Sequence, residues 1–198
     1  WIDRLTTDGT WSGNLFDFYR RIYSKLTIGL KVPFRLEGGS KRIDETHVHE
    51  ALREALVNTL IHADYSGRPG ILVVKRPDVF GFRNPGGLRI SAERALAGGI
   101  SDCRNRNLQK MFQLIGAGEQ AGSGLPKVLA AWKEQDWRTP QLAENSDPDM
   151  TILVLRMVSL LPKETIEKLD KRIGPQFRAM SQTQRLALVA VAIEGKVT

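Results

Sequence analysis

Two polar residues stand one helical turn apart in a predicted helix, and their side chains could hold a metal-bound phosphate. The helix is expected over residues 46–63, and Glu54, Asn58 and His62 share one of its faces at intervals of four residues. An amide oxygen can ligate a hard cation such as Mg²⁺, and a carboxylate can accept a proton from an attacking water. An ordinary solvated helix face has the same spacing, and His62 could equally be a structural histidine.

Two glycine-containing runs follow, at places where the backbone could approach a ligand. Asn84-Pro-Gly-Gly87 ends a predicted strand, and its glycines carry no Cβ that would keep a flat ligand away. Gly122-Ser-Gly124 precedes a predicted helix, whose free N–H groups favour anions. A simple turn and a flexible loop with a capping serine are the alternative interpretations of these runs.

The elements that must position these residues predict an α+β fold. Apolar residues at helical spacing predict helices over 12–28, 46–63, 91–97, 107–114, 122–132 and 183–194. Short apolar runs between turn residues predict strands over 33–36, 71–74, 79–82, 141–145 and 150–158. Ser12 is expected to cap the first helix. We expect a mostly antiparallel mixed sheet with helices on one face, followed by a C-terminal helical fragment.

The composition is typical of a globular domain with a basic surface. Hydrophobic residues make up 41% of the 198 residues, and no apolar run is long enough to span a bilayer. The net charge of +7 favours anionic partners such as nucleotides or nucleic acid, although scattered basic residues also make an ordinary solvated surface. The lone Cys103 cannot form an internal disulfide or a thiolate zinc cluster, and it favours a cytoplasmic location.

The order of the three runs resembles the GHKL ATPase superfamily. This resemblance implies a Bergerat-type sandwich that binds ATP and Mg²⁺, with Glu54 as the catalytic base and Asn58 as the metal ligand. It implies adenine contacts from Asn84, Gly86 and Gly87, and phosphate contacts from Gly122, Ser123 and Gly124. The family has an aspartate where Asn84 stands, and an amide keeps one acceptor oxygen but loses the charge, which weakens a hydrogen bond by about 1 kcal/mol.

The stretch between the second and third runs, residues 88–121, corresponds to the ATP lid of that superfamily. Arg104, within it, would meet a γ-phosphate when the lid closes, or it would belong with Asn105 to a helix-capping pair. His62 completes the cofactor-binding set through the face that it shares with Asn58. The chain has no P-loop run, so a helicase is not expected.

Four runs are similar to the GHKL-type domain of bacterial Schlafen-AlbA-associated transcriptional regulators: His49–Ser66, Asn84–Leu88, Arg104-Asn105 and Glu119–Gly124. The similarity spans residues 10–160. It implies an ATP-binding regulatory module of a bacterial DNA-binding regulator. Whether the module also hydrolyses ATP slowly with Mg²⁺ is left open. The alternative is a degenerate GHKL fold that serves as a structural or dimerisation module. Direct nucleic-acid binding, prompted by the charge, is a third hypothesis.

The predicted division is an ATP-binding domain over 1–161, a linker over 162–180 and the start of a truncated winged-helix domain over 181–198. Because the chain begins at Trp1, we expect a fragment of a longer protein. The expected partners are a nucleotide, DNA through domains outside this sequence, and a second copy of the chain, with no membrane association.

Overall fold

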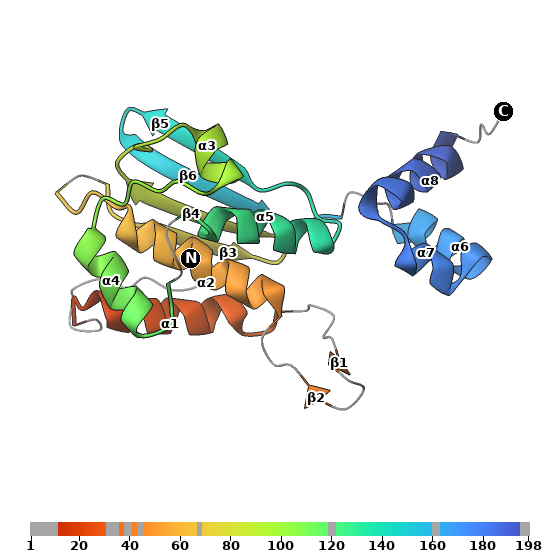
Figure 1. The fold of residues 1–198 in the computed structure, drawn as a ribbon, viewed down its shortest axis with the longest axis horizontal. Coiled ribbons are helices and arrows are strands. Elements are labelled where there is room, and N and C mark those ends of the chain that lie inside the picture. Colours follow the sequence, from red (N-terminus) through yellow and green to blue (C-terminus); the bar gives the residue numbers. More distant parts are fainter. Residues whose placement is uncertain are drawn as a thin grey trace.

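An antiparallel sheet with helices on one face forms the body of the protein (Figure 1). The structure, a computed structural model, describes residues 12–30, 36–37, 41–42, 46–66, 69–118, 122–159 and 163–194. The helices are α1 (Leu15–Thr27), α2 (His47–Ile61), α3 (Ala92–Ala97), α4 (Arg106–Leu114), α5 (Gly124–Glu134), α6 (Lys163–Ile173), α7 (Pro175–Ala179) and α8 (Gln182–Glu194). The strands are β1 (Leu36–Glu37), β2 (Lys41–Arg42), β3 (Leu72–Arg76), β4 (Val79–Pro85), β5 (Gln141–Ser146) and β6 (Asp149–Arg156).

The sheet order is β3-β4-β6-β5, and β1 pairs with β2 separately. Neighbouring strands in both ladders are antiparallel, while an isolated parallel bridge joins Gly86 to Met150. The predicted α+β class is confirmed. Most of the strand predicted at 33–36 lies outside the described residues.

Side-chain alternation in β4 and β6 places a polar pair on the helix-covered face. Phe82 is 2% exposed, and Asn84, the next residue on that face, is 6% exposed. Asn84 pairs with Thr151 of β6, and Leu153 continues the same buried face. The strand was predicted to end at Phe82 but extends to Pro85, so Asn84 is a strand residue rather than part of a turn.

Helix α2 is buried on nearly every side, because it packs against α1, α5 and the sheet. Its predicted apolar residues Leu52, Leu56 and Leu60 are fully buried. The opposite face is also buried, since Glu54 is only 4% exposed. The face of α2 that carries Glu54 is therefore not solvated. The carboxyl group of Glu54 is buried between packed elements.

The caps of α1 and α2 are formed by side chains, and that of α1 differs from the predicted Ser12. Asn14, not Ser12, caps α1, because its Oδ1 accepts from the backbone N–H groups of Phe16 and Asp17. At the start of α2, the backbone N–H of Thr46 donates to Nδ1 of His49 over 3.2 Å. A histidine thus takes the place that Glu or Gln has in a capping box.

The C-terminal residues form three helices with a small core of their own. Leu169, Phe177 and Val189 are buried together. The segment 162–180, predicted as a linker, is instead largely helical, because α6 and α7 bury apolar residues against α8. The division of the chain into domains remains a prediction. No helix in the described part of the chain is both long and apolar enough to cross a bilayer.

Candidate functional site

Glu54 and Asn58 of α2 face the first residue of α5. A Cβ placed on Gly124 would lie 2.7 Å from Glu54 Oε2 and 2.9 Å from Asn58 Nδ2. These separations are shorter than real Cβ contacts, so the two helices meet this closely because residue 124 is glycine. The first and third sequence runs, far apart in the chain, are therefore adjacent in the fold.

A cavity of about 100 Å³ lies between α2, the sheet and the lid. Six of the predicted site residues line it: Asn58, His62, Asn84, Gly87, Gly122 and Gly124. The other four are not among its lining residues: Glu54, Gly86, Arg104 and Ser123. Glu54 instead lies directly behind Gly124, while Gly86 and Arg104 support the turn at the opposite end.

Asn84 and Thr151 form a polar pair in the wall of this cavity. Asn84 Nδ2 donates to the carbonyl of Pro85 over 3.2 Å, and the hydroxyl of Thr151 donates to the carbonyl of Gly86 over 2.8 Å. An aspartate has no N–H for the first bond, so the asparagine fits this backbone and still has an amide oxygen as acceptor. The sequence reasoning missed Thr151, which the pairing of β4 with β6 places opposite Asn84.

Arg104 does not line the cavity, and it joins the glycine turn to the end of α2. Its Nε donates to the carbonyl of His62 and its NH2 group to the carbonyl of Gly87, each over 3.1 Å. Gly86 has φ +88°, and a Cβ there would lie 2.8 Å from the guanidinium. Arg104 thus contacts backbone here, rather than a phosphate position. Asn105 occupies the N-cap position of α4, but its side-chain amide donates to carbonyls at the end of α2.

The lid lies against the glycine loop that precedes α5. The backbone N–H of Gly99 donates to the carbonyl of Gly122 over 3.0 Å. Gly122 has φ +85°, and a Cβ there would lie 2.8 Å from the backbone nitrogen of Ile100. Ser123 is the N-cap residue of α5 and makes no side-chain capping bond. Residues 119–121 of the predicted lid lie outside the described part of the chain.

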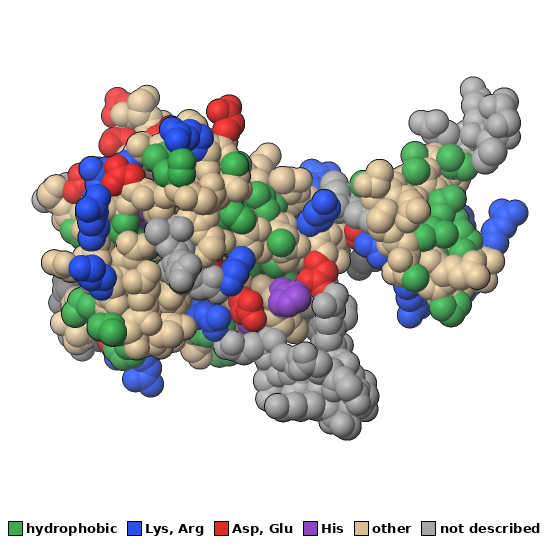
Figure 2. Space-filling view, viewed as in Figure 1, with side chains coloured by type: hydrophobic (Ala, Val, Ile, Leu, Met, Phe, Trp, Pro, Cys, Tyr) green, Lys and Arg blue, Asp and Glu red, His purple; other side chains and the backbone are tan. Residues whose placement is uncertain are grey.

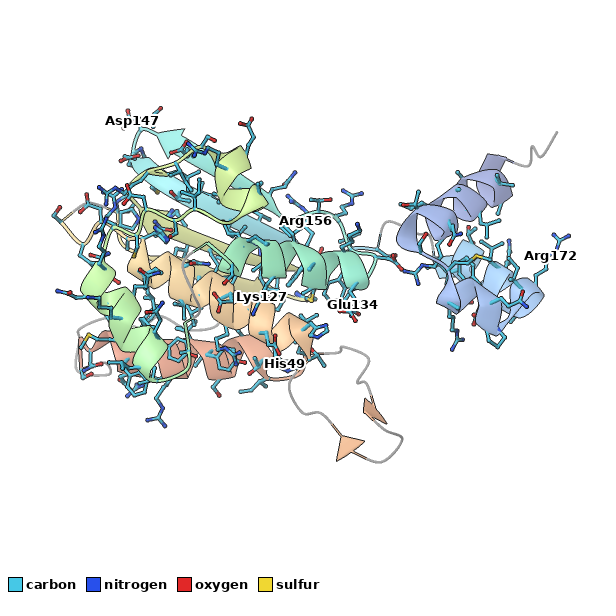
Figure 3. All side chains as sticks on the ribbon, in the orientation of Figure 1. His49, Lys127, Glu134, Asp147, Arg156 and Arg172 are labelled. Atoms are coloured by element: carbon cyan, nitrogen blue, oxygen red, sulfur yellow. The ribbon has the colours of Figure 1, made fainter. Side chains whose placement is uncertain are left out.

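Arg89 and Asp102 line the cavity as an ion pair over 3.3 Å, and burial shifts the pKa of two further groups nearby. Burial, and then the positive charge of Arg104, lower the pKa of His62, so its imidazole favours the neutral form. Burial raises the pKa of the Cys103 thiol, which lies 3.5 Å from the carbonyl of Ile61, and this agrees with a spectator role. Lys127, labelled on α5 in Figure 3, is exposed and does not line the cavity.

The side chains near Gly124 could hold a metal ion only if a bound phosphate compound supplied further oxygen ligands. Within the described ranges, no group of three His, Cys, Asp or Glu residues could hold a metal ion. The site instead has one carboxylate, from Glu54, and one amide, from Asn58. Mg²⁺ is commonly held by one or two protein groups together with water and substrate phosphates, so these residues fit Mg²⁺ that arrives with a phosphate ligand.

Comparison with known proteins supports an ATPase-like domain. Residues 75–154 match a HATPase-type family model described as "Putative ATP-dependent DNA helicase recG C-terminal". The matched residues include β4, the lid and α5, but not α2. No curated protein has a significant match to this sequence.

A solved structure, the DIP2311 protein from Corynebacterium diphtheriae, has a similar fold with a TM-score of 0.60. The two sequences are 23% identical, and the similarity covers 80% of this chain and 32% of that one. This chain therefore spans about a third of the length of DIP2311. At this identity the likeness shows the fold alone.

Proposed function

We propose that this ATPase-like domain binds a nucleotide, with ATP as the first candidate, in the cavity beneath the lid. One observation carries the proposal: Asn58 and Gly124 line a cavity that Asn84 and Thr151 also border, and the Glu54 carboxylate lies directly behind Gly124. Apolar side chains, including Phe82, complete the wall. A mostly apolar cavity with a few placed polar groups is typical of small-molecule sites.

The residues at the α5 end would bind the phosphates and act on water. The loop from Gly122 opens α5, whose free N–H groups favour anions. Asn58 would hold Mg²⁺ through its amide oxygen, and the ion would neutralise phosphate charge. If the nucleotide is hydrolysed, the Glu54 carboxylate would orient the water and accept its proton. The amide oxygen of Asn84 would accept a hydrogen bond from the base.

Binding would require the lid to move away from α5. The cavity of about 100 Å³ is smaller than most ligand pockets, which hold roughly 300–1,000 Å³. Opening would break the bond between Gly99 and Gly122 and leave both glycines free to change conformation. Nucleotide binding and lid position would therefore be coupled.

The wider proposal is a GHKL-type regulatory module of a bacterial DNA-binding transcription regulator. Its support is the ordered set of sequence runs together with the contact between α5 and the C-terminal helices. Asp136, two residues after α5, pairs with Arg185 of α8 over 2.8 Å. A nucleotide at one end of α5 could thus influence helices at its other end. The narrow cavity and Asn84 favour the second candidate, a non-catalytic structural or dimerisation module.

The test is a thermal-shift and calorimetric titration with ATP, ADP and GTP, with and without Mg²⁺. We expect Mg-ATP to raise the Tm by mass action, and Asn58→Ala to remove the Mg-dependent part of that rise. Glu54→Gln should keep nucleotide binding and lower any phosphate release. Gln176→Ala, which removes an exposed amide of α7 outside the cavity, is the matched control.

No shift at millimolar nucleotide would reject nucleotide binding. The structural module would then be tested by sedimentation of the intact chain and by the regulatory output of Glu54→Ala and Asn58→Ala. That alternative predicts unchanged output from both variants.

A further inference from the structure

A second hollow, separate from the cavity beneath the lid, lies at the start of α4, which is itself part of the lid. Its volume is about 670 Å³. It is lined by residues of α1, of the loop after α2, of the lid and of the first turn of α4: Leu15, Tyr65, Arg89, Cys103, Arg104, Asn105, Arg106, Asn107 and Leu108. Only Arg89 also lines the first cavity, so the proposed nucleotide site does not account for this hollow.

Three guanidinium groups border the hollow, and only part of their charge is neutralised. Arg89 Nε lies 3.3 Å from a carboxylate oxygen of Asp102, and Arg104 NH1 lies 4.0 Å from one of Asp64. Arg106 is exposed and forms no ion pair with any described residue. Figure 2 shows Lys and Arg side chains along the left edge of the molecule, with Asp and Glu side chains among them towards the top. The hollow is therefore a positively charged surface that would attract anions.

One of these arginines is already held in place. The two bonds from Arg104 to the carbonyls of His62 and Gly87 fix the plane of its guanidinium and leave NH1 at the weak, 4.0 Å contact with Asp64. A guanidinium has five N–H donors, so further donors remain for a ligand. A donor that is fixed before binding loses little freedom when it binds, which favours phosphate recognition here.

An aromatic side chain lies beside the charged groups. The Tyr65 hydroxyl donates to the carbonyl of Leu60 over 2.9 Å, which holds the ring, and the residue is still 48% exposed. Asn107 adds an exposed amide at the rim. Proteins bind single-stranded nucleic acid with basic side chains that contact its phosphate backbone and aromatic side chains on which its bases stack. The hollow contains both kinds of side chain.

We propose that this hollow binds a short segment of single-stranded nucleic acid. Its phosphates would lie at Arg89, Arg104 and Arg106, and a base would stack on Tyr65. The net charge of +7 would assist the encounter. The proposal does not depend on nucleotide binding beneath the lid, so the two can fail separately.

The test is fluorescence anisotropy of a labelled single strand of about 12 nucleotides, added to the full chain at about 50 mM salt. We expect the double variant Arg89→Ala/Arg106→Ala to raise the Kd at least about tenfold and to flatten its salt dependence. The matched control is Arg76→Ala/Arg138→Ala, which removes two exposed arginines outside the hollow and should change the Kd less than about twofold. Tyr65→Phe should retain binding, and Tyr65→Leu should weaken it.

Three results would overturn the proposal: no binding at low salt, equal weakening by both double variants, or full displacement of the strand by equimolar tripolyphosphate. The second would indicate non-specific attraction, and the third a site for small phosphates. Circular-dichroism melting of each variant separates lost binding from lost folding. The pair Arg89→Gln/Arg106→Gln, which keeps polar side chains, replaces any alanine variant that melts early.

Discussion

At Gly124, the absence of one carbon atom decides whether α2 and α5 can meet. We predict that Gly124→Ala raises the Kd for Mg-ATP at least about tenfold, because the new Cβ would lie within 3 Å of the Glu54 carboxylate and the Asn58 amide and would displace them. Isothermal titration calorimetry measures the change. Gly70→Ala is the control, since a Cβ there meets no atom within 4 Å. Unchanged affinity in Gly124→Ala would contradict the proposed site.

His62 gives the folded protein a dependence on acid pH. Burial and Arg104 lower its pKa below the ordinary 6.5, so below that pH the unfolded chain binds more protons than the folded chain. The stabilisation is complete above about pH 6.5 and is lost as the pH falls from there towards the lowered pKa. We expect the free energy of unfolding in urea to fall over this window, and to fall less in His62→Gln. Parallel pH profiles for the two proteins would refute this assignment.

At the scale of elements, Arg104 joins the lid to the end of α2 and to the turn after β4. We predict that Arg104→Ala lowers the free energy of unfolding by about 1–3 kcal/mol, because it leaves two carbonyl groups without a charged donor. Hydrogen exchange of the lid amides should become faster. Arg94→Ala, an exposed lid arginine on α3, should change neither quantity appreciably. Equal effects from both variants would show that the stability depends on the positive charge of the lid rather than on the two bonds from Arg104 to backbone carbonyls.

At the scale of the whole molecule, the pair between Asp136 and Arg185 connects the α+β body to α8. Both side chains are largely buried, at 16% and 19% exposure. We predict a coupling free energy of about 1 kcal/mol from a double-mutant cycle of Asp136→Asn and Arg185→Gln, measured by urea unfolding. The pair between Asp170 and Arg178, which joins α6 to α7, is more exposed and should give a smaller coupling. A coupling near zero for Asp136 and Arg185 would remove this route from α5 to the C-terminal helices.

Most of the fold was predictable because its signals are local. The apolar spacing of Leu52, Leu56 and Leu60 predicted α2, and turn residues separated the strands. The missed features depend on contacts with other elements. Strand β4 runs past Phe82 because β6 pairs with it as far as Pro85. Helix α6 was missed because its sequence is mostly charged, and it packs through a few apolar residues against α7 and α8.

Within the candidate site, the sequence alone determined which residue types occur and in what order: Glu54 and Asn58 one turn apart, then the Asn84 turn, then the Gly122 loop. Residue type and local spacing are properties of a short stretch of chain. Only the tertiary structure decided which of these residues meet. It placed Thr151 beside Asn84 and turned Arg104 onto the backbone, because such contacts join residues far apart in the chain and depend on how the elements pack.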